Sequence, residues 1–136
     1  MKYDELKRKM SASSVRRKPR HIESGIQQAC VSWFRLRYPQ YLCFSVPNGG
    51  SRNSIEAYNL KKEGALAGVS DLIVVAHCSV LFVEMKNEKG RQTEYQKDFQ
   101  RKVEMLGFEY AVCRSLDDFM GKVSEWLSRQ YAKNAE

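Results

Sequence analysis

Three charged side chains stand where the surrounding residues predict buried, apolar structure. Asp71 opens the segment 71–76, and Glu84 and Lys86 close the segment 80–86; the other residues of both segments are apolar. Such runs are typical of strands buried on both faces, where charged residues are rare unless they are paired or bind a metal ion. Asp71, Glu84 and Lys86 are therefore the first candidates for chemistry.

A tight turn centred between His77 and Cys78 would join these two segments as a hairpin. Counting outward from that turn places Asp71 directly opposite Glu84. Because side chains alternate between the two faces of a strand, Lys86 emerges on the same face as Glu84. The spacing predicts that all three side chains converge at one end of a sheet.

Two facing carboxylates and a lysine suit the cutting of a phosphodiester bond. Like charges on opposed residues destabilise a hairpin, so the pair should either raise one pKa or attract a cation. Carboxylate oxygens suit a hard ion such as Mg²⁺, which polarises a phosphoryl oxygen and lowers the pKa of a bound water. The Lys86 ammonium adds a positive charge beside the charge that develops on phosphorus. The alternative is a turn residue, Asp71, and a solvated Glu84–Lys86 ion pair at a fraying strand end.

The elements that must position these residues are predicted from the periodicity of apolar residues and from the glycine, proline and turn residues between them. We predict helices over residues 21–37, 54–63, 93–106 and 116–129, and strands over 41–46, 71–76, 80–87 and 108–114. The order is α-β-α-β-β-α-β-α. The tight turn requires an antiparallel pair, whereas the helix between the last two strands requires a crossover and a parallel pair. The predicted fold class is α/β, a mixed sheet of about four strands flanked by helices.

Length and composition indicate one globular domain outside the membrane. The chain has 136 residues, 43% hydrophobic and 29% charged, and no apolar run of the roughly 20 residues that a transmembrane helix requires. We expect a cytoplasmic protein. The four cysteines show no zinc-binding spacing and are expected to be small buried or half-buried residues.

The positive charge is concentrated at the N-terminus. Residues 1–20 contain eight Lys and Arg and two acidic residues, whereas the other 116 contain 15 basic and 14 acidic residues. We interpret 1–20 as a basic, mobile arm that holds a phosphate backbone without reading sequence, and 21–136 as the single folded domain. The alternative is a solvated tail that only aids solubility.

At these residues the chain resembles the PD-(D/E)XK nuclease superfamily, and within it the virus-type replication-repair nuclease, or VRR-NUC, family. The resemblance covers about residues 22–116. The motifs that carry it are Glu23, Pro47-Asn48-Gly49-Gly50-Ser51-Arg52, Gly64-Ala-Leu-Ala-Gly68-Val-Ser-Asp71, Val83-Glu84-Met85-Lys86, and Gln96 with Phe99. One departure is Ser70, where the superfamily name has proline.

The resemblance implies a role for each matching residue. Asp71 and Glu84 would bind Mg²⁺, or Mn²⁺ as a substitute, together with the Met85 carbonyl, and Glu23 would reach the site from the first helix. Lys86 would be catalytic, and Gln96 would position Lys86 or the substrate. Glu23 could instead only favour a helix N-terminus, and Gln96 could be a solvated helix residue. The loop with Asn48, Gly49, Gly50 and Arg52 would approach the DNA backbone, or simply make a turn.

These observations lead to the hypothesis of a Mg²⁺-dependent, structure-selective DNA endonuclease. Stand-alone members of the family look like junction resolvases, so branched DNA such as a four-way (Holliday) junction is the expected substrate. A flap-, nick- or end-directed nuclease and a non-cutting DNA-binding module of the same fold are the alternatives. Resolving a junction requires two cuts, which predicts a homodimer. Candidate dimer contacts are Trp126, Leu127 and Val123, or Trp33 and Phe34, although core packing could also claim them.

Overall fold

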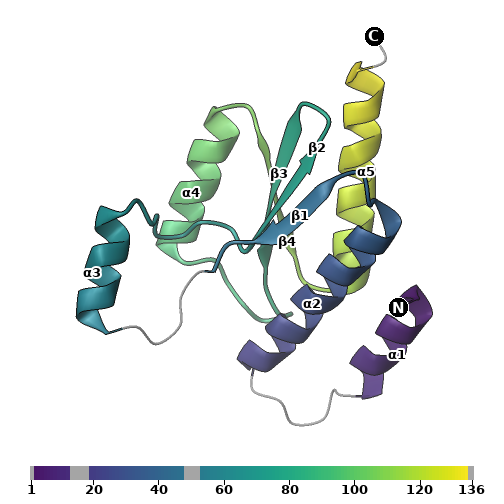
Figure 1. Ribbon diagram of the computed structural model, residues 1–136, viewed down its shortest axis with the longest axis horizontal. Helices are drawn as coiled ribbons and strands as arrows, with labels where there is room; N and C mark the ends of the chain where they lie inside the picture. The colour runs from purple at the N-terminus through teal and green to yellow at the C-terminus, as the bar shows by residue number, and fades with distance from the viewer. Residues whose placement is uncertain (1, 13–18, 48–52, 135–136) are drawn as a thin grey trace.

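The computed structural model describes residues 2–12, 19–47 and 53–134, in which helices flank a single sheet (Figure 1). From its second helix onward, the chain follows the predicted order of elements. In sequence they are α1 (Tyr3–Ala12), α2 (Pro19–Arg37), β1 (Leu42–Ser45), α3 (Ser54–Lys62), β2 (Leu72–Ala76), β3 (Ser79–Met85), α4 (Glu94–Met105), β4 (Glu109–Cys113) and α5 (Leu116–Asn134).

The sheet has the strand order β1-β2-β3-β4 and is mixed, as predicted. β1 pairs antiparallel with β2, β2 pairs antiparallel with β3, and β3 pairs parallel with β4. In the β2–β3 hairpin Leu72 lies opposite Val83 and Ala76 lies opposite Ser79, which is the register expected from a turn at His77 and Cys78. Continuing that register by one position brings Asp71 opposite Glu84.

The sheet lies between two helical layers. Helices α2 and α5 cover one face, and α4 covers the other (Figure 1). Along β3, Leu81, Val83 and Met85 belong to the main core, which is shared with α2 and α5. Phe82 points to the opposite face, where its ring lies 5.5 Å from that of Phe99 on α4. Because side chains alternate along a strand, Glu84 also faces the α4 layer.

The main core contains the apolar residues that the sequence offers as candidate dimer contacts. Phe34 and Val123 are fully buried, and Trp126 and Trp33 are 2% and 7% exposed. Leu127 packs against the same cluster and is partly buried. These side chains pack α2 and α5 against the sheet. They are core residues, so they are not available as dimer contacts. Cys30, Cys43 and Cys113 are buried as expected, whereas Cys78 in the hairpin turn is exposed.

Helix α1 lies within residues 1–20, the segment interpreted from the sequence as a basic, mobile arm. It packs on α2, and Tyr3 contacts the main core. The Tyr3 hydroxyl donates to Asp117 Oδ1 at 3.0 Å, and Lys7 Nζ lies 3.3 Å from the same oxygen. The acidic start of α5 thus provides a partner that periodicity within the arm could not reveal.

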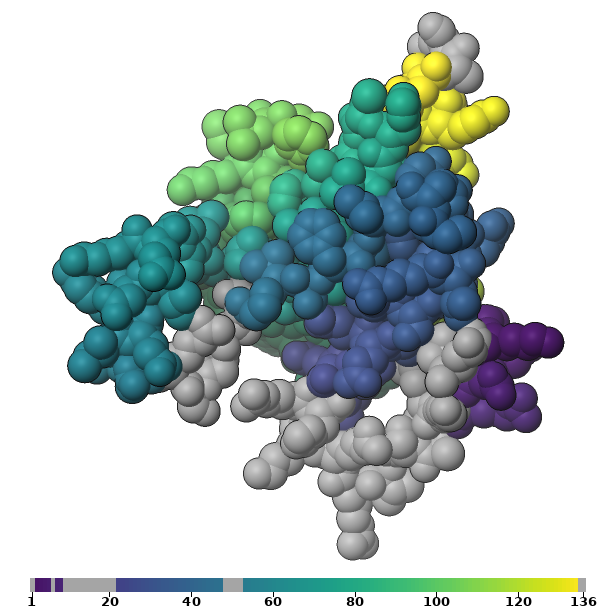
Figure 2. Space-filling model, viewed as in Figure 1, coloured from purple at the N-terminus to yellow at the C-terminus, as the bar shows by residue number. Residues whose placement is uncertain are grey.

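Helix α3 projects from the rest of the molecule (Figures 1 and 2). The Asn53 side chain caps its N-terminus by accepting from the Glu56 N–H at 2.8 Å, and Gly64 follows its end with φ +107°. None of the residues of α3 is buried. The residues at its two ends, Asn53 and Gly64, rather than packing against other elements, define this helix. None of the helices in the described residues is long and apolar enough to cross a membrane.

Candidate active site

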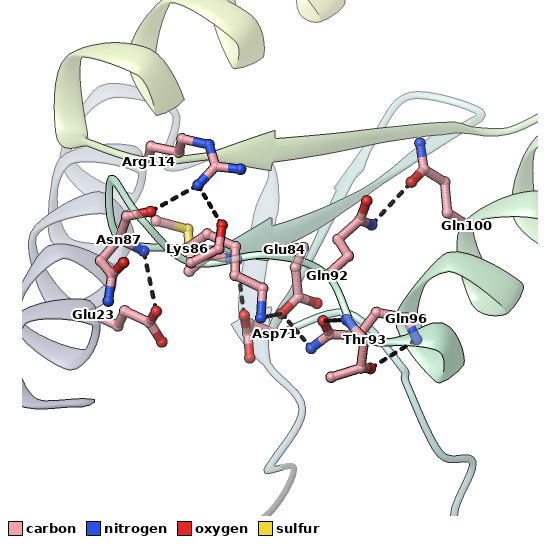
Figure 3. Close-up of polar contacts among 12 residues, drawn as sticks. Glu23, Asp71, Glu84, Lys86, Asn87, Gln92, Thr93, Gln96, Gln100 and Arg114 are labelled. Carbon is pink, nitrogen blue, oxygen red and sulfur yellow. Dashed lines mark hydrogen bonds and ion pairs between the residues drawn. The ribbon is translucent and has the colours of Figure 1, made fainter. Parts of the chain in front are cut away.

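Asp71 is fixed at the entrance to β2 by hydrogen bonds on both sides. Its carbonyl accepts from the Val46 N–H at 2.9 Å, which extends the pairing of β1 and β2. Its side-chain Oδ2 accepts from the Met85 N–H at 2.8 Å, across the hairpin. The carboxylate is therefore held at the end of β3, beside Glu84 and Lys86 (Figure 3).

Glu84 is a buried carboxylate with incomplete hydrogen bonding. It is 2% exposed, and its Oε1 accepts from Gln96 Nε2 at 3.1 Å and lies 4.0 Å from Lys86 Nζ. Its Oε2 is buried and has no hydrogen-bond partner among the described residues. A buried oxygen without a partner is costly in a folded protein. The burial of Glu84 rules out a solvated ion pair at a fraying strand end.

The environment of Glu84 strongly favours its protonated form. Burial, followed by the nearby Asp71 carboxylate, raises the pKa of Glu84 to about 9, whereas Lys86 opposes the shift. A carboxyl group so perturbed by burial and a like charge is a typical feature of functional sites. A proton or a bound cation would each relieve the repulsion between the two carboxylates.

Lys86 completes the cluster as a nearly buried cation. Its side chain is 12% exposed, and its backbone N–H donates to the Cys113 carbonyl at 3.0 Å, continuing the parallel pairing of β3 and β4. The strand thus fixes the start of the side chain, and its ammonium points toward Glu84 and Asp71 (Figure 3). The predicted convergence of Asp71, Glu84 and Lys86 is observed.

Gln96 joins the site to the start of α4. Its side-chain Oε1 accepts from the Thr93 backbone N–H at 2.9 Å, and its backbone N–H donates to Thr93 Oγ1 at 3.2 Å. The two hydrogen bonds together form a capping box. Its Nε2 donates to Glu84 Oε1, so Gln96 contacts the carboxylate of Glu84 rather than Lys86 (Figure 3). The alternative of a solvated helix residue does not hold, because Gln96 is half-buried and both polar atoms of its side chain are hydrogen-bonded.

Gly68 allows α4 to come this close to the sheet. It has φ +84°, and a Cβ placed on it would lie 2.2 Å from the Tyr95 carbonyl oxygen and 2.7 Å from the Gln96 N–H nitrogen. The backbone before β2 therefore touches the backbone of the first turn of α4. Ser70, which stands where the superfamily name has proline, is fully buried and donates to the Leu72 carbonyl at 3.2 Å.

Glu23 lies beside the cluster but contacts the backbone after Lys86. Its Oε1 accepts from the Asn87 N–H at 3.0 Å (Figure 3). Across residues 2–12, 19–47 and 53–134, no three His, Cys, Asp or Glu side chains gather closely enough to hold a metal ion. The structure therefore does not bring Glu23 together with Asp71 and Glu84 as a ligand set. Asn48, Gly49, Gly50 and Arg52 lie outside the described residues.

The donor set nevertheless fits a hard divalent cation. Two carboxylates meet at one sheet end, and the unpartnered Oε2 of buried Glu84 is the oxygen that a cation would satisfy. Asp71 and Glu84 are the side chains that would hold such an ion, and the Met85 carbonyl is the third ligand that the resemblance implies. The neutralising charge would also offset the repulsion that raises the pKa of Glu84.

Sequence reasoning missed Arg114, which follows β4 directly. Its Nη1 donates to the carbonyls of Asn87 at 2.8 Å and Gly90 at 2.7 Å (Figure 3). The available signal was topological. The carboxyl ends of parallel strands meet at the same edge of a sheet, so the residue after β4 had to lie near the residues after β3.

Comparison with known proteins agrees with this geometry. A family model for the VRR-NUC domain matches residues 9–117, most of the chain. The chain belongs to the VRR-NUC family. A solved structure described as a VRR_NUC domain protein is similar with a TM-score of 0.65 and 19% sequence identity, over 84% of this chain and 92% of that one. No curated protein matches. As a VRR-NUC protein, the chain has a nuclease-type function in DNA processing, and the restriction-endonuclease-like α/β fold is confirmed.

Proposed function

We propose that this VRR-NUC protein is a Mg²⁺-dependent, structure-selective DNA endonuclease whose site is formed by Asp71, Glu84 and Lys86. The observation that carries the proposal is buried Glu84, which has an unpartnered Oε2 within the described chain and lies beside a second carboxylate and a lysine. Burying these charged groups costs free energy, and DNA binding alone does not require that cost. Mn²⁺ is expected to substitute for Mg²⁺.

Each residue would contribute a separate part of the reaction. Bound Mg²⁺ would supply Lewis acidity and a water of lowered pKa. Asp71 and Glu84 would hold the cation, and Gln96 restrains Glu84 Oε1 through its 3.1 Å hydrogen bond. Lys86, 12% exposed and 4.0 Å from Glu84, places a positive charge where negative charge grows on the phosphoryl group.

Branched duplex DNA, including a four-way junction, is the proposed substrate. The support for a DNA substrate is positive charge on the protein, suited to a phosphate backbone: eight basic residues lie in 1–20 and the chain carries a net charge of +7. No zinc-finger motif or recognition helix for base reading is evident in the sequence. Phosphate contacts and DNA shape should therefore dominate over base sequence. Flap-, nick- or end-directed cutting is the alternative, and a panel of DNA substrates separates it from junction cutting.

The test is cleavage of labelled four-way junction, flap, nicked and linear duplexes with Mg²⁺, Mn²⁺ or EDTA. Asp71→Ala, Glu84→Ala and Lys86→Ala should each lower the cleavage rate by at least about a hundredfold, because each removes a group used in the transition state. Lys97→Ala, at an exposed position on α4, is the matched control and should cut like wild type. Full activity in excess EDTA, or in any of the three site variants, would refute the assignment.

A further inference from the structure

Arg114 connects the end of β4 to the turn that follows Lys86. A single nitrogen, Nη1, donates to both the Asn87 carbonyl and the Gly90 carbonyl. These two oxygens lie at the two ends of the turn, which is itself closed by a 3.2 Å hydrogen bond from the Gly90 N–H to the Asn87 carbonyl. The guanidinium therefore holds both ends of one turn.

This turn lies against the side chain of Lys86. A Cβ placed on Gly90 would be 3.3 Å from Lys86 Cδ and 3.5 Å from Glu23 Oε1. The methylene stem of Lys86 thus passes directly under the turn, whereas its ammonium continues to Glu84 (Figure 3). A displacement of the turn changes the space in which the lysine stem lies.

Arg114 is itself held firmly in place. Its backbone N–H donates to Asp118 Oδ2 at 3.0 Å, at the start of α5. The preceding residue, Cys113, is fully buried and accepts from the Lys86 N–H. Glu23 holds the opposite side of the turn through the Asn87 N–H. The turn is consequently fixed from α2 and from the β4–α5 connection at once.

We propose that Arg114 is a positioning residue for Lys86: by holding the 87–90 turn over the lysine stem, it keeps the ammonium directed at the two carboxylates. The proposal rests on the proposed function for its effect on cleavage, but the placement of Lys86 can be measured without any reaction. A misplacement of about 1 Å in a reacting group commonly lowers a rate by about a hundredfold. Substrate affinity should be unaffected, since Arg114 Nη1 already donates to two carbonyl groups of the protein.

The test compares Arg114→Ala with Arg114→Lys. The alanine variant should lower the single-turnover rate at saturating four-way junction with Mg²⁺ by about tenfold to a hundredfold, with an unchanged Kd. Lysine should restore the rate to within about fivefold of wild type, because both hydrogen bonds come from one nitrogen and an ammonium has three donors. An NMR order parameter for Lys86 Cε, measured without DNA, should fall in Arg114→Ala and recover in Arg114→Lys.

Arg129→Ala is the matched control. Arg129, on α5, also makes two contacts, from Nη1 to Glu125 at 2.8 Å and from Nη2 to Glu109 at 2.5 Å. Glu109 begins β4, at the end of the strand opposite to Arg114. The Arg129→Ala variant should leave both the rate and the Lys86 order parameter unchanged. If Arg129→Ala lowers the rate as much as Arg114→Ala does, the effect is general destabilisation and the proposal fails.

Gly90→Ala provides a second route should Arg114→Ala fail to fold. Its added methyl group presses on the Lys86 stem while leaving Arg114 intact, and it should lower the rate without changing Kd. An unchanged Lys86 order parameter in Arg114→Ala, or a wild-type rate in both Arg114→Ala and Gly90→Ala, would overturn the proposal. If the wild-type protein cuts none of the DNA substrates, the proposed function fails, and the order parameter still decides the role of Arg114.

Discussion

The two oxygens of Glu84 have different surroundings, and this difference explains how one residue can be both buried and reactive. Oε1 is restrained by Gln96 and lies near Lys86, whereas Oε2 has no hydrogen-bond partner in the described part of the chain. Burial and Asp71 together raise the pKa of the group to about 9. Without a cation, the folded protein therefore holds a proton on Glu84 at neutral pH.

This proton makes a prediction about stability and pH. Folding raises the pKa of Glu84 from an ordinary value of 4.5 to about 9. Between these two pH values the folded chain binds a proton that the unfolded chain has released, so the contribution of Glu84 is fully present below pH 4.5 and is lost as pH rises through 9. In EDTA, the free energy of unfolding of wild type relative to Glu84→Gln should fall by up to about 1.4 kcal/mol per pH unit in this window.

Denaturant unfolding of both proteins from about pH 5 to about pH 9 measures this difference. Glu84→Gln keeps the size of the side chain and can still bond to Gln96, but it does not titrate. Mg²⁺ at about pH 8 should stabilise wild type and leave Glu84→Gln nearly unchanged. Parallel stability curves for the two proteins would show that Glu84 does not change its protonation on folding.

At the scale of elements, the approach of α4 to the segment that precedes β2 decides whether Gln96 reaches Glu84. Gly68 makes that approach possible, since its backbone touches the Tyr95 carbonyl. Gly68→Ala combines a positive φ with a backbone clash and should lower the free energy of unfolding by about 2 kcal/mol or more. Gly64→Ala also has positive φ but nothing within 4 Å, and it should cost about 1 kcal/mol.

Thermal unfolding and cleavage assays on the two variants separate the effect of backbone strain on stability from the effect of a displaced α4 on the site. Gly68→Ala should lower activity more than its loss of stability explains, because the start of α4 must move and carries Gln96 with it. Gly64→Ala should cut at the wild-type rate below its Tm. Equal loss of activity in both variants would mean that the α4 contact does not position the site.

The elements whose signals are local could be predicted from the sequence. The tight turn at His77 and Cys78 and the alternation of side chains were sufficient for the β2–β3 register, and through it for the meeting of Asp71, Glu84 and Lys86. The contacts that helix α1 and Arg114 make with distant segments were not predicted. Helix α1 depends on Asp117, more than a hundred residues away, and the role of Arg114 depends on parallel pairing that places two strand ends together. Neither partner is visible in a local pattern.

At the scale of the whole molecule, the basic N-terminal segment and the nearly neutral remainder should have separable roles. Deletion of residues 1–18 should weaken DNA binding, and the slope of log K against log salt should become shallower by about 0.9 for each phosphate that the shortened protein no longer neutralises. Some metal-dependent cutting should remain, since Asp71, Glu84 and Lys86 lie outside the deletion. Fluorescence anisotropy at several salt concentrations provides the measurement.

Tyr3→Phe is the control for the deletion, because it removes the hydrogen bond to Asp117 and keeps every positive charge. A reduced affinity with an unchanged slope in Tyr3→Phe would indicate that docking of α1, rather than charge, supports DNA binding. An unchanged slope in the deletion protein would show that the basic segment does not bind phosphates.

Assembly is the last property that follows from the whole molecule. Resolving a four-way junction requires two symmetric cuts, and the described chain has one cluster of Asp71, Glu84 and Lys86. A twofold homodimer would present two sites to opposite strands. The core already uses the aromatic residues of α2 and α5, so a dimer contact needs other apolar residues. The edge strand β1 exposes such residues, with Leu42 at 61% and Phe44 at 40%.

We therefore predict that the protein sediments as a dimer at micromolar concentration, with or without Mg²⁺. If β1 provides the contact, Leu42→Glu should shift the protein to a monomer, because a buried charge opposes association. Leu106→Glu, at the 76% exposed residue that follows the C-terminus of α4, is the control and should leave the dimer intact. The monomeric variant should still nick DNA but lose paired cutting of a junction. A wild-type monomer that cuts flaps or nicks would exclude junction resolution and leave the chemistry of Asp71, Glu84 and Lys86 unchanged.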